Sequence, residues 1–163
     1  MHVCRASRAL FAIVCVLGMA QCSRPNPPFR VHRVEALGLT VTLPGDWRGG
    51  SVRGAGHIYS SGPANCSLIL AEGHPTGIAI SEAGARTFVA ERLATTVLST
   101  GRRTVGQIAV LEATGANSAP PRHYVGFLSM PERRAWVHLT TSGLEPRAAD
   151  ALWTSIIGSL RLR

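Results

Sequence analysis

Histidine, cysteine, serine and carboxylate side chains could carry chemistry, but in this chain they lie at no spacing that a common reaction requires. The histidines beyond residue 30 form neither H-x-H nor H-x-x-x-H, the spacings of a local zinc site; they are His32, His57, His74, His123 and His138. No serine lies in G-x-S-x-G, and C-x-x-C is absent. The nine acidic residues are dispersed. We therefore predict no catalytic residue, no metal site and no cofactor.

The N-terminal stretch has the residue order of a secretion signal. Arg5 and Arg8 precede an uncharged apolar run over 9–20, which ends in small residues. This run is about a dozen residues long, whereas a helix needs about 20 to span a bilayer. We predict that residues 1–21 are a signal peptide that is removed on export. The alternative is an uncleaved short membrane helix.

Residues 17–22, LGMAQC, resemble the lipobox of bacterial lipoproteins. In that family the cysteine sulfur receives a diacylglycerol, the chain is cut just before it, and the new amino terminus is usually acylated, for example with palmitate. The family favours Leu and a small residue where this chain has Met19 and Gln21. The resemblance implies that Cys22 is the lipid-attachment residue and that 22–34, rich in proline, is a lipid-anchored tether.

The other cysteine beyond the leader is Cys66, in the apolar run 66–70. Such surroundings favour a buried and inert thiol. If the leader is instead cut after Ala20, Cys22 stays unmodified. A Cys22–Cys66 disulfide can then form, because the exported compartment is oxidising.

The chain is basic without a basic cluster. Its formal net charge is +8, and all 17 basic residues are arginine. They are scattered along the sequence, whereas a nucleic-acid surface gathers them on one element with aromatic partners. We predict no nucleic-acid partner, and attraction to anionic lipid or wall polymers stays open.

Alternating apolar and polar residues predict the first strands at 31–34, 39–43, 57–60 and 66–71. The glycine-rich segment 49–56 is predicted to be loose. Trp47, Trp136 and Trp153 are predicted to be core residues rather than ligand platforms.

Two helices are predicted. The first begins after Ser81, a capping residue, carries an apolar stripe and ends near Val97 or Leu98, with Glu82 and Arg86 able to pair. The second begins at Pro146 and has the clearest apolar stripe of the chain; its members are Ala149, Leu152, Trp153, Ile156 and Leu160.

Between the two helices, strands are predicted at 102–105, 107–113, 123–130 and 134–141. The last two form a hairpin, which could bring His123 and His138 together because paired strands lie about 5 Å apart. The alternative is two ordinary histidines.

Short connections imply antiparallel pairing, and one-faced helices must bury their stripes on the sheet. The sequence thus predicts one α+β domain over 35–163, an antiparallel β-sheet flanked by helices. Residues 38–47, GLTVTLPGDW, and 153–160, WTSIIGSL, resemble the Mog1/PsbP-like family and its lipoprotein members. The resemblance implies an α/β/α sandwich and a binding or accessory role, and it carries over no site residue.

These observations predict a cell-envelope lipoprotein that binds a partner protein or a lipidic or cell-wall ligand and is not an enzyme. Its predicted location is the bacterial envelope, on the periplasmic or outer face of a membrane. The alternatives are a small secreted enzyme, hydrolase-like with an unrecognised site, a soluble secreted protein with the Cys22–Cys66 disulfide, and a structural envelope lipoprotein.

Overall fold

The computed structural model describes residues 28–53, 56–75 and 80–163. The predicted signal peptide and the predicted lipid-attachment residue Cys22 lie outside these residues, so both stay predictions. No helix in the described part of the chain combines the length and the apolar character that crossing a membrane requires.

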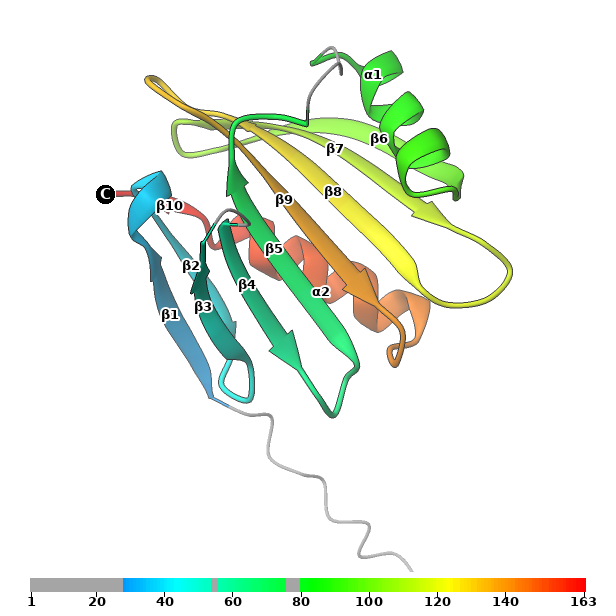
Figure 1. Ribbon diagram of the computed structural model, residues 1–163, viewed down its shortest axis with the longest axis horizontal. Helices are drawn as coiled ribbons and strands as arrows, with labels where there is room; N and C mark the ends of the chain where they lie inside the picture. The colour runs from blue at the N-terminus through cyan, green and yellow to red at the C-terminus, as the bar shows by residue number, and fades with distance from the viewer. Residues whose placement is uncertain (1–27, 54–55, 76–79) are drawn as a thin grey trace, which may run out of the picture.

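The described strands form two antiparallel sheets (Figure 1). The small sheet has the order β1-β2-β10 and contains β1 (Phe29–Val34), β2 (Leu39–Pro44) and β10 (Arg161–Leu162). The large sheet has the order β3-β4-β5-β9-β8-β7-β6. Its strands are β3 (Arg48–Val52), β4 (Gly56–Ser61), β5 (Cys66–Glu72), β6 (Thr96–Val105), β7 (Ile108–Ala116), β8 (Arg122–Ser129) and β9 (Arg134–Thr141).

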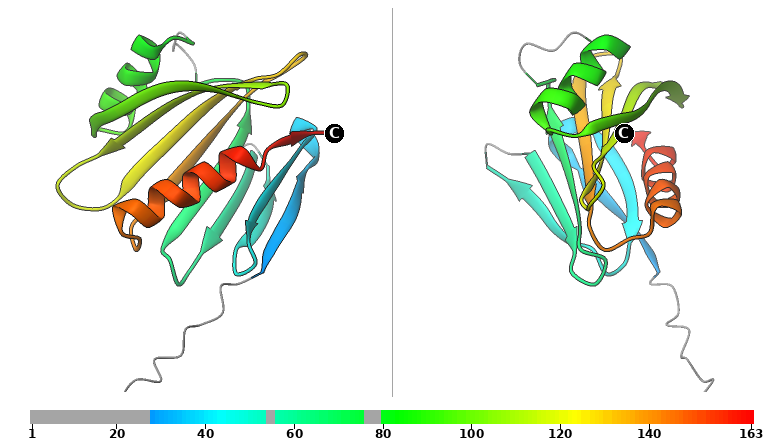
Figure 2. Two further views of the ribbon diagram at one scale, coloured as in Figure 1. Left: turned by 180° about the vertical axis from the view of Figure 1, so that it is seen from behind. Right: turned by 90° about the vertical axis from the view of Figure 1, so that its right-hand side faces the viewer.

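Two different elements cover the inner face of the large sheet. Helix α2 (Pro146–Gly158) lies behind the later strands, and the small sheet lies beside it (Figures 1 and 2). One core joins the large sheet, the small sheet and α2. Leu39 and Val41 of β2, Leu68 of β5 and Trp153 of α2 belong to the same buried cluster. The predicted stripe of α2 and the predicted burial of Trp47 and Trp153 are confirmed.

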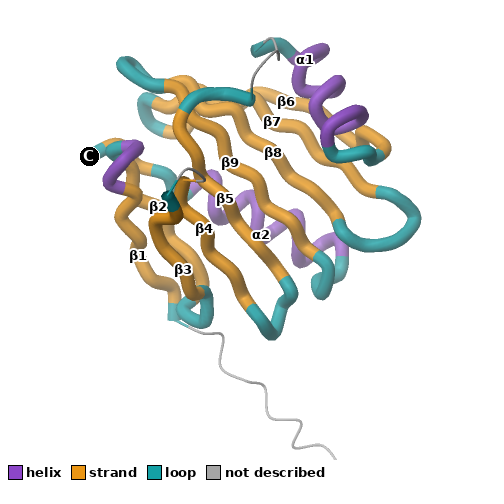
Figure 3. The backbone as a smooth tube through the Cα atoms, in the orientation of Figure 1, coloured by secondary structure: helices purple, strands orange, loops and turns teal. Residues whose placement is uncertain are grey.

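Helix α1 (Glu82–Thr87) lies on the other face (Figure 3), capped by Ser81 as predicted. The antiparallel α+β fold is therefore confirmed, but the predicted sandwich needs a correction. Half of the inner face is covered by a second sheet rather than by a helix, because β1, β2 and β10 hydrogen-bond to one another and not to the large sheet.

Strand β1 corrects the predicted extent of the tether. It begins at Phe29, inside the range 22–34, and pairs with β2 along its whole length, from Phe29 opposite Pro44 to Val34 opposite Leu39. Residues 29–34 are thus part of the folded domain. A tether can occupy residues 22–28 at most.

The first helix ends earlier than its apolar stripe predicts. It continues as a π-helix over Phe88–Arg92, and Thr96 and Val97 already belong to β6. Ala94 adopts a left-handed backbone with φ of 50°. The Asn117 side chain holds this turn by donating to the Ala94 carbonyl and accepting from the Thr96 N–H. Tertiary contact therefore overrides the helical pattern.

Two smaller expectations were also wrong. Glu82 forms its ion pair with Arg102 of β6, at 3.5 Å, and not with Arg86. The glycine-rich segment predicted to be loose contains β3, which pairs with β4. Glycine permits this strand, because Gly49 has φ of +150° and a Cβ there would collide with the Ile58 carbonyl oxygen.

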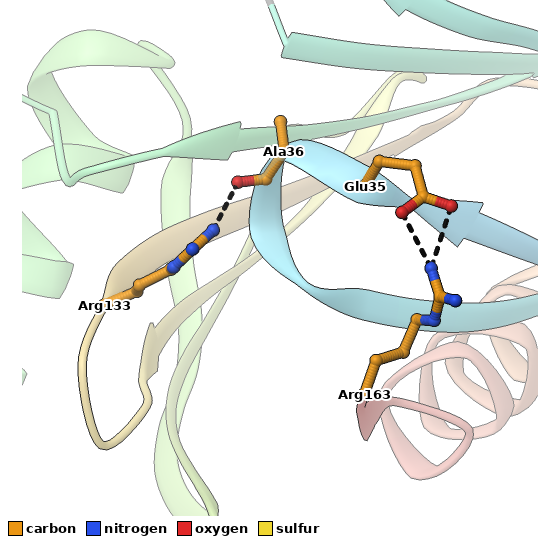
Figure 4. A network of polar contacts seen from close by, with 4 residues as sticks. All are labelled: Glu35, Ala36, Arg133 and Arg163. Carbon is orange, nitrogen blue, oxygen red and sulfur yellow. Dashed lines mark hydrogen bonds and ion pairs between the residues drawn. The ribbon is translucent and has the colours of Figure 1, made fainter.

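The end of the chain is fastened to the first turn (Figure 4). A short 3₁₀ turn, η1 (Glu35–Leu37), joins β1 to β2. The Arg163 Nη1 donates to both carboxylate oxygens of Glu35, at 2.7 and 2.8 Å, and the Arg133 Nη1 donates to the Ala36 carbonyl at 2.8 Å. Strand β10 and the β8–β9 turn are thereby linked to η1.

We expect Gly49→Ala to lower the free energy of unfolding by about 2 kcal/mol, because the added Cβ must displace the backbone of β4. Gly50→Ala is the matched control, since a Cβ at Gly50 meets nothing within 4 Å. It should change stability by less than about 0.5 kcal/mol. Urea unfolding of both variants measures the difference, and equal stabilities would contradict the packing described for β3.

Candidate functional site

Part of the outer face of the large sheet lies uncovered. Neighbouring strands place Ile58, Ile69 and His138 in one row across β4, β5 and β9. A second row contains Ser60, Ser67, Thr140 and His123, and a third contains Ala71 and Trp136. Except for the exposed Ser60, these side chains are half-buried. We call these nine residues the open face.

The open face ends where α1 and the π-helix begin. Ala85, Phe88 and Val89 bury an apolar cluster against Leu111 of β7 and Phe127 of β8. Beyond this cluster no described helix covers the outer face, and strands β4, β5 and β9 face the viewer in Figure 1. Trp136 lies at this boundary with its ring edge-on to Phe88, at a centroid distance of 6.1 Å. It is half-buried, so its predicted place in the core was wrong.

A groove of about 700 Å³ adjoins the open face. Ile69, Ala71 and Trp136 contribute apolar lining, and Arg53 and Glu72 contribute one charge of each sign. His57 also lines it; this residue is buried and its Nδ1 has no partner among the described residues. A groove with apolar walls and a few polar groups is the usual form of a binding site.

His123 and His138 meet on the open face, as the hairpin allowed. The His123 Nδ1 and the His138 Nε2 are 3.0 Å apart, the distance of a hydrogen bond. The Thr140 Oγ1 lies 3.4 Å from the same His138 nitrogen. One imidazole must donate its N–H and the other must accept, so the contact requires at least one neutral ring.

Burial sets the protonation of this pair. Burial, with the neighbouring His123 as a smaller cause, lowers the pKa of His138 to about 4. Burial also lowers the pKa of His123 below its ordinary value of 6.5. Both rings are therefore neutral at pH 7, and His138 is a poor base for activating a hydroxyl, because an effective general base has a pKa near the working pH.

The other polar clusters in the described residues have the geometry of contacts that hold the fold, not of a catalytic site. The Tyr124 hydroxyl donates to Asp150 at 2.6 Å, and Arg122 is 3.4 Å from the same carboxylate. Burial and this hydrogen bond raise the pKa of Tyr124, so the phenol stays protonated. Ser61 donates to Asp46, a contact without a histidine. Within residues 28–53, 56–75 and 80–163, no group of three or more His, Cys, Asp or Glu is placed to hold a metal ion.

Cys66 is a buried thiol, as predicted, with 3% of its surface exposed. Its Sγ donates to the Ala64 carbonyl. Burial, together with the nearby Asp46, raises its pKa to about 11. A thiol with this pKa is almost entirely protonated at pH 7 and is a weak nucleophile. Its suggested disulfide partner, Cys22, lies outside the described residues.

Sequence alone pointed to the histidine pair but not to the open face around it. The alternation in 57–60 and 66–71 gives each strand two faces, and it does not say which face an element covers. Trp136 therefore looked like a core residue. The half-burial of Ile58, Ile69 and Trp136 follows from the position of α1 over β7 and β8, which only the packed structure reveals.

The comparisons with known proteins show the fold. No protein-family model matches the chain, and no curated protein matches it. Among solved structures, the cyanobacterial PsbP protein CyanoP from Synechocystis sp. PCC 6803 is similar with a TM-score of 0.61 and 11% sequence identity. The match covers 89% of this chain and 99% of CyanoP. The predicted PsbP-like fold is thus confirmed.

A second solved structure is similar over part of its length. The immunity protein TplEi of the type VI secretion system of Pseudomonas aeruginosa, in complex with a peptide, gives a TM-score of 0.44 at 16% identity. The match covers 77% of this chain and 49% of TplEi.

The histidine pair predicts a stability that falls as the pH falls. Because the folded state lowers the pKa of His138 to about 4, the unfolded chain binds the proton first, and stability is lost below about pH 6.5. Between pH 7 and pH 5 we expect His138→Gln to lose about 1 to 2 kcal/mol less than the wild type. Urea unfolding at both pH values measures this, and identical losses would contradict the buried pair.

Proposed function

We propose that this protein is an exported envelope lipoprotein that works without catalysis, by holding a partner protein against the open face. The observation that carries the proposal is the exposure of one half of the outer sheet face. Ile58, Ile69 and Trp136 present apolar surface there, beside a groove with only a few polar groups. Apolar surface of this kind, rimmed by polar residues, is typical of interaction sites.

The chemistry of the open face favours binding over catalysis. His138 is the described histidine that lies nearest a hydroxyl on this face, and its lowered pKa makes it a weak base. Cys66 is buried and protonated. A hydrolase would need a nucleophile and a base with matched pKa values in one cleft.

Export and lipid attachment rest on the leader and on Cys22. The folded domain fits this role, because β1 begins seven residues after Cys22 and a chain there can serve as a short tether. Acylation at Cys22 would keep the domain at a membrane surface, since two or more acyl chains anchor a protein stably.

Metabolic labelling with an alkyne palmitate tests the anchor. In bacterial cells that express the full chain, we expect wild-type protein to incorporate the label and to fractionate with membranes. Cys22→Ser should lose both properties. Cys66→Ser is the matched control and should retain the label, because its thiol is buried. Unlabelled wild-type protein would reject the anchor.

Site-specific photo-crosslinking in intact cells tests the binding face. We expect Ile69→p-benzoylphenylalanine to give one discrete protein adduct, because this side chain lies at the centre of the open face. The control is Arg147→p-benzoylphenylalanine, an exposed position on α2 behind the sheet. Adducts that are absent at 69, or equal at both positions, would overturn the proposed role of the open face.

A further inference from the structure

The small sheet has an outer side that no described element covers. Strand alternation directs Val34 and His32 of β1 inward: Val34 is fully buried, and the His32 ring contacts Tyr59 of β4 at 4.9 Å. Phe29, Val31 and Arg33 therefore point outward. The register adds their neighbours, and together they form what we call the membrane-facing side: Phe29, Val31, Arg33, Thr40, Thr42, Pro44 and Arg161.

This side carries the most exposed apolar residues of the described chain. Four large hydrophobic side chains of the described residues are exposed. Phe29 (59%) and Val31 (67%) lie on this side, and Val52 (43%) and Leu98 (50%) lie elsewhere. Phe29 and Val31 lie two residues apart on the same strand and the same side. Val52 and Leu98 belong to β3 and β6, at opposite edges of the large sheet. Only β1 therefore concentrates exposed apolar surface.

The charge on this side is positive. Arg33 and Arg161 flank Thr40 in one cross-strand row. Neither forms an ion pair with a described carboxylate: Arg161 donates to the Gly158 and Leu160 carbonyls, and the ion pairs involve other arginines. None of the seven residues of the side is acidic.

The position of β1, close to Cys22 in the chain, indicates what would contact this side. Phe29 lies seven positions after Cys22, and an extended chain of that length spans at most about 25 Å. An aromatic and an aliphatic side chain beside unpaired arginines suit a bilayer interface, where apolar groups enter the headgroup region and arginines meet lipid phosphates. A protein partner of this charge would have to supply its own carboxylates at the same points.

We propose that the membrane-facing side of the small sheet rests on an anionic lipid bilayer. Phe29 and Val31 enter the headgroup region, and Arg33 and Arg161 face the lipid phosphates. This inference rests on the proposed function, which places a membrane beside Cys22. It also orients the molecule, because the shared core separates the small sheet from the open face. The open face is turned away from the lipid.

Photo-crosslinking to lipid tests the inference on the full chain in vesicles of phosphatidylethanolamine and phosphatidylglycerol. We expect Val31→p-benzoylphenylalanine to give phospholipid adducts, identified by mass, at least tenfold more abundantly than Leu98→p-benzoylphenylalanine. Leu98 is the matched control, because it is exposed to a similar degree on β6. Equal yields at the two positions overturn the proposal. A protein adduct in place of the lipid adduct at 31 also overturns it.

Charge is tested with the same probe. Adding Arg33→Gln should reduce the lipid adduct at position 31 about fivefold, as should adding Arg161→Gln, because an arginine near anionic lipid contributes about 1 kcal/mol. Replacing phosphatidylglycerol by phosphatidylcholine should act in the same direction. If none of the three changes lowers the yield of lipid adduct at position 31, the proposed role of charge is overturned.

The two proposals fail separately. Palmitate labelling at Cys22 without lipid adducts at 31 would leave the anchor standing and reject the membrane-facing side. Lipid adducts at 31 in a chain that takes up no palmitate would support the membrane-facing side and reject the anchor.

Discussion

The apolar core between the large sheet and the layer behind it is the constraint on which the structure depends. A seven-stranded sheet presents more inner surface than one 13-residue helix can cover. The small sheet covers the rest, so Leu39, Val41 and Leu43 of β2 belong to the same buried cluster as Trp153 and Ile156 of α2. The open face and the outer side of the small sheet lie on either side of this core.

The outer face shows what happens where cover is limited. Helix α1 and its π-helical continuation bury one apolar cluster over β7 and β8, and then the chain turns at Ala94 into β6. Because this helical segment lies over β7 and β8, it leaves Ile69 and Trp136 half-buried, and the candidate binding face is a consequence of that placement.

Sequence reasoning recovered the elements whose signals are local. Ser81 and Pro146 start helices, and the alternation at 39–43 gives a strand whose apolar residues are buried. It failed where distant residues decide. Asn117 holds the turn at Ala94, the partner strand β4 makes a strand of residues 48–52, and β2 makes a strand of residues 29–34, part of the range predicted as a tether. Local sequence patterns do not predict such long-range contacts.

The pairing of β10 with β2 bears on how the chain folds as it is synthesised. Residues 161–163 leave the ribosome after all other described residues, yet they complete a sheet that begins at Phe29 and fasten it through Arg163 and Glu35. The closing contact thus spans 128 positions. Contacts of such separation form late, because a long loop must first be closed. A chain that crosses a membrane N-terminus first would therefore complete the small sheet only after residues 161–163 had followed.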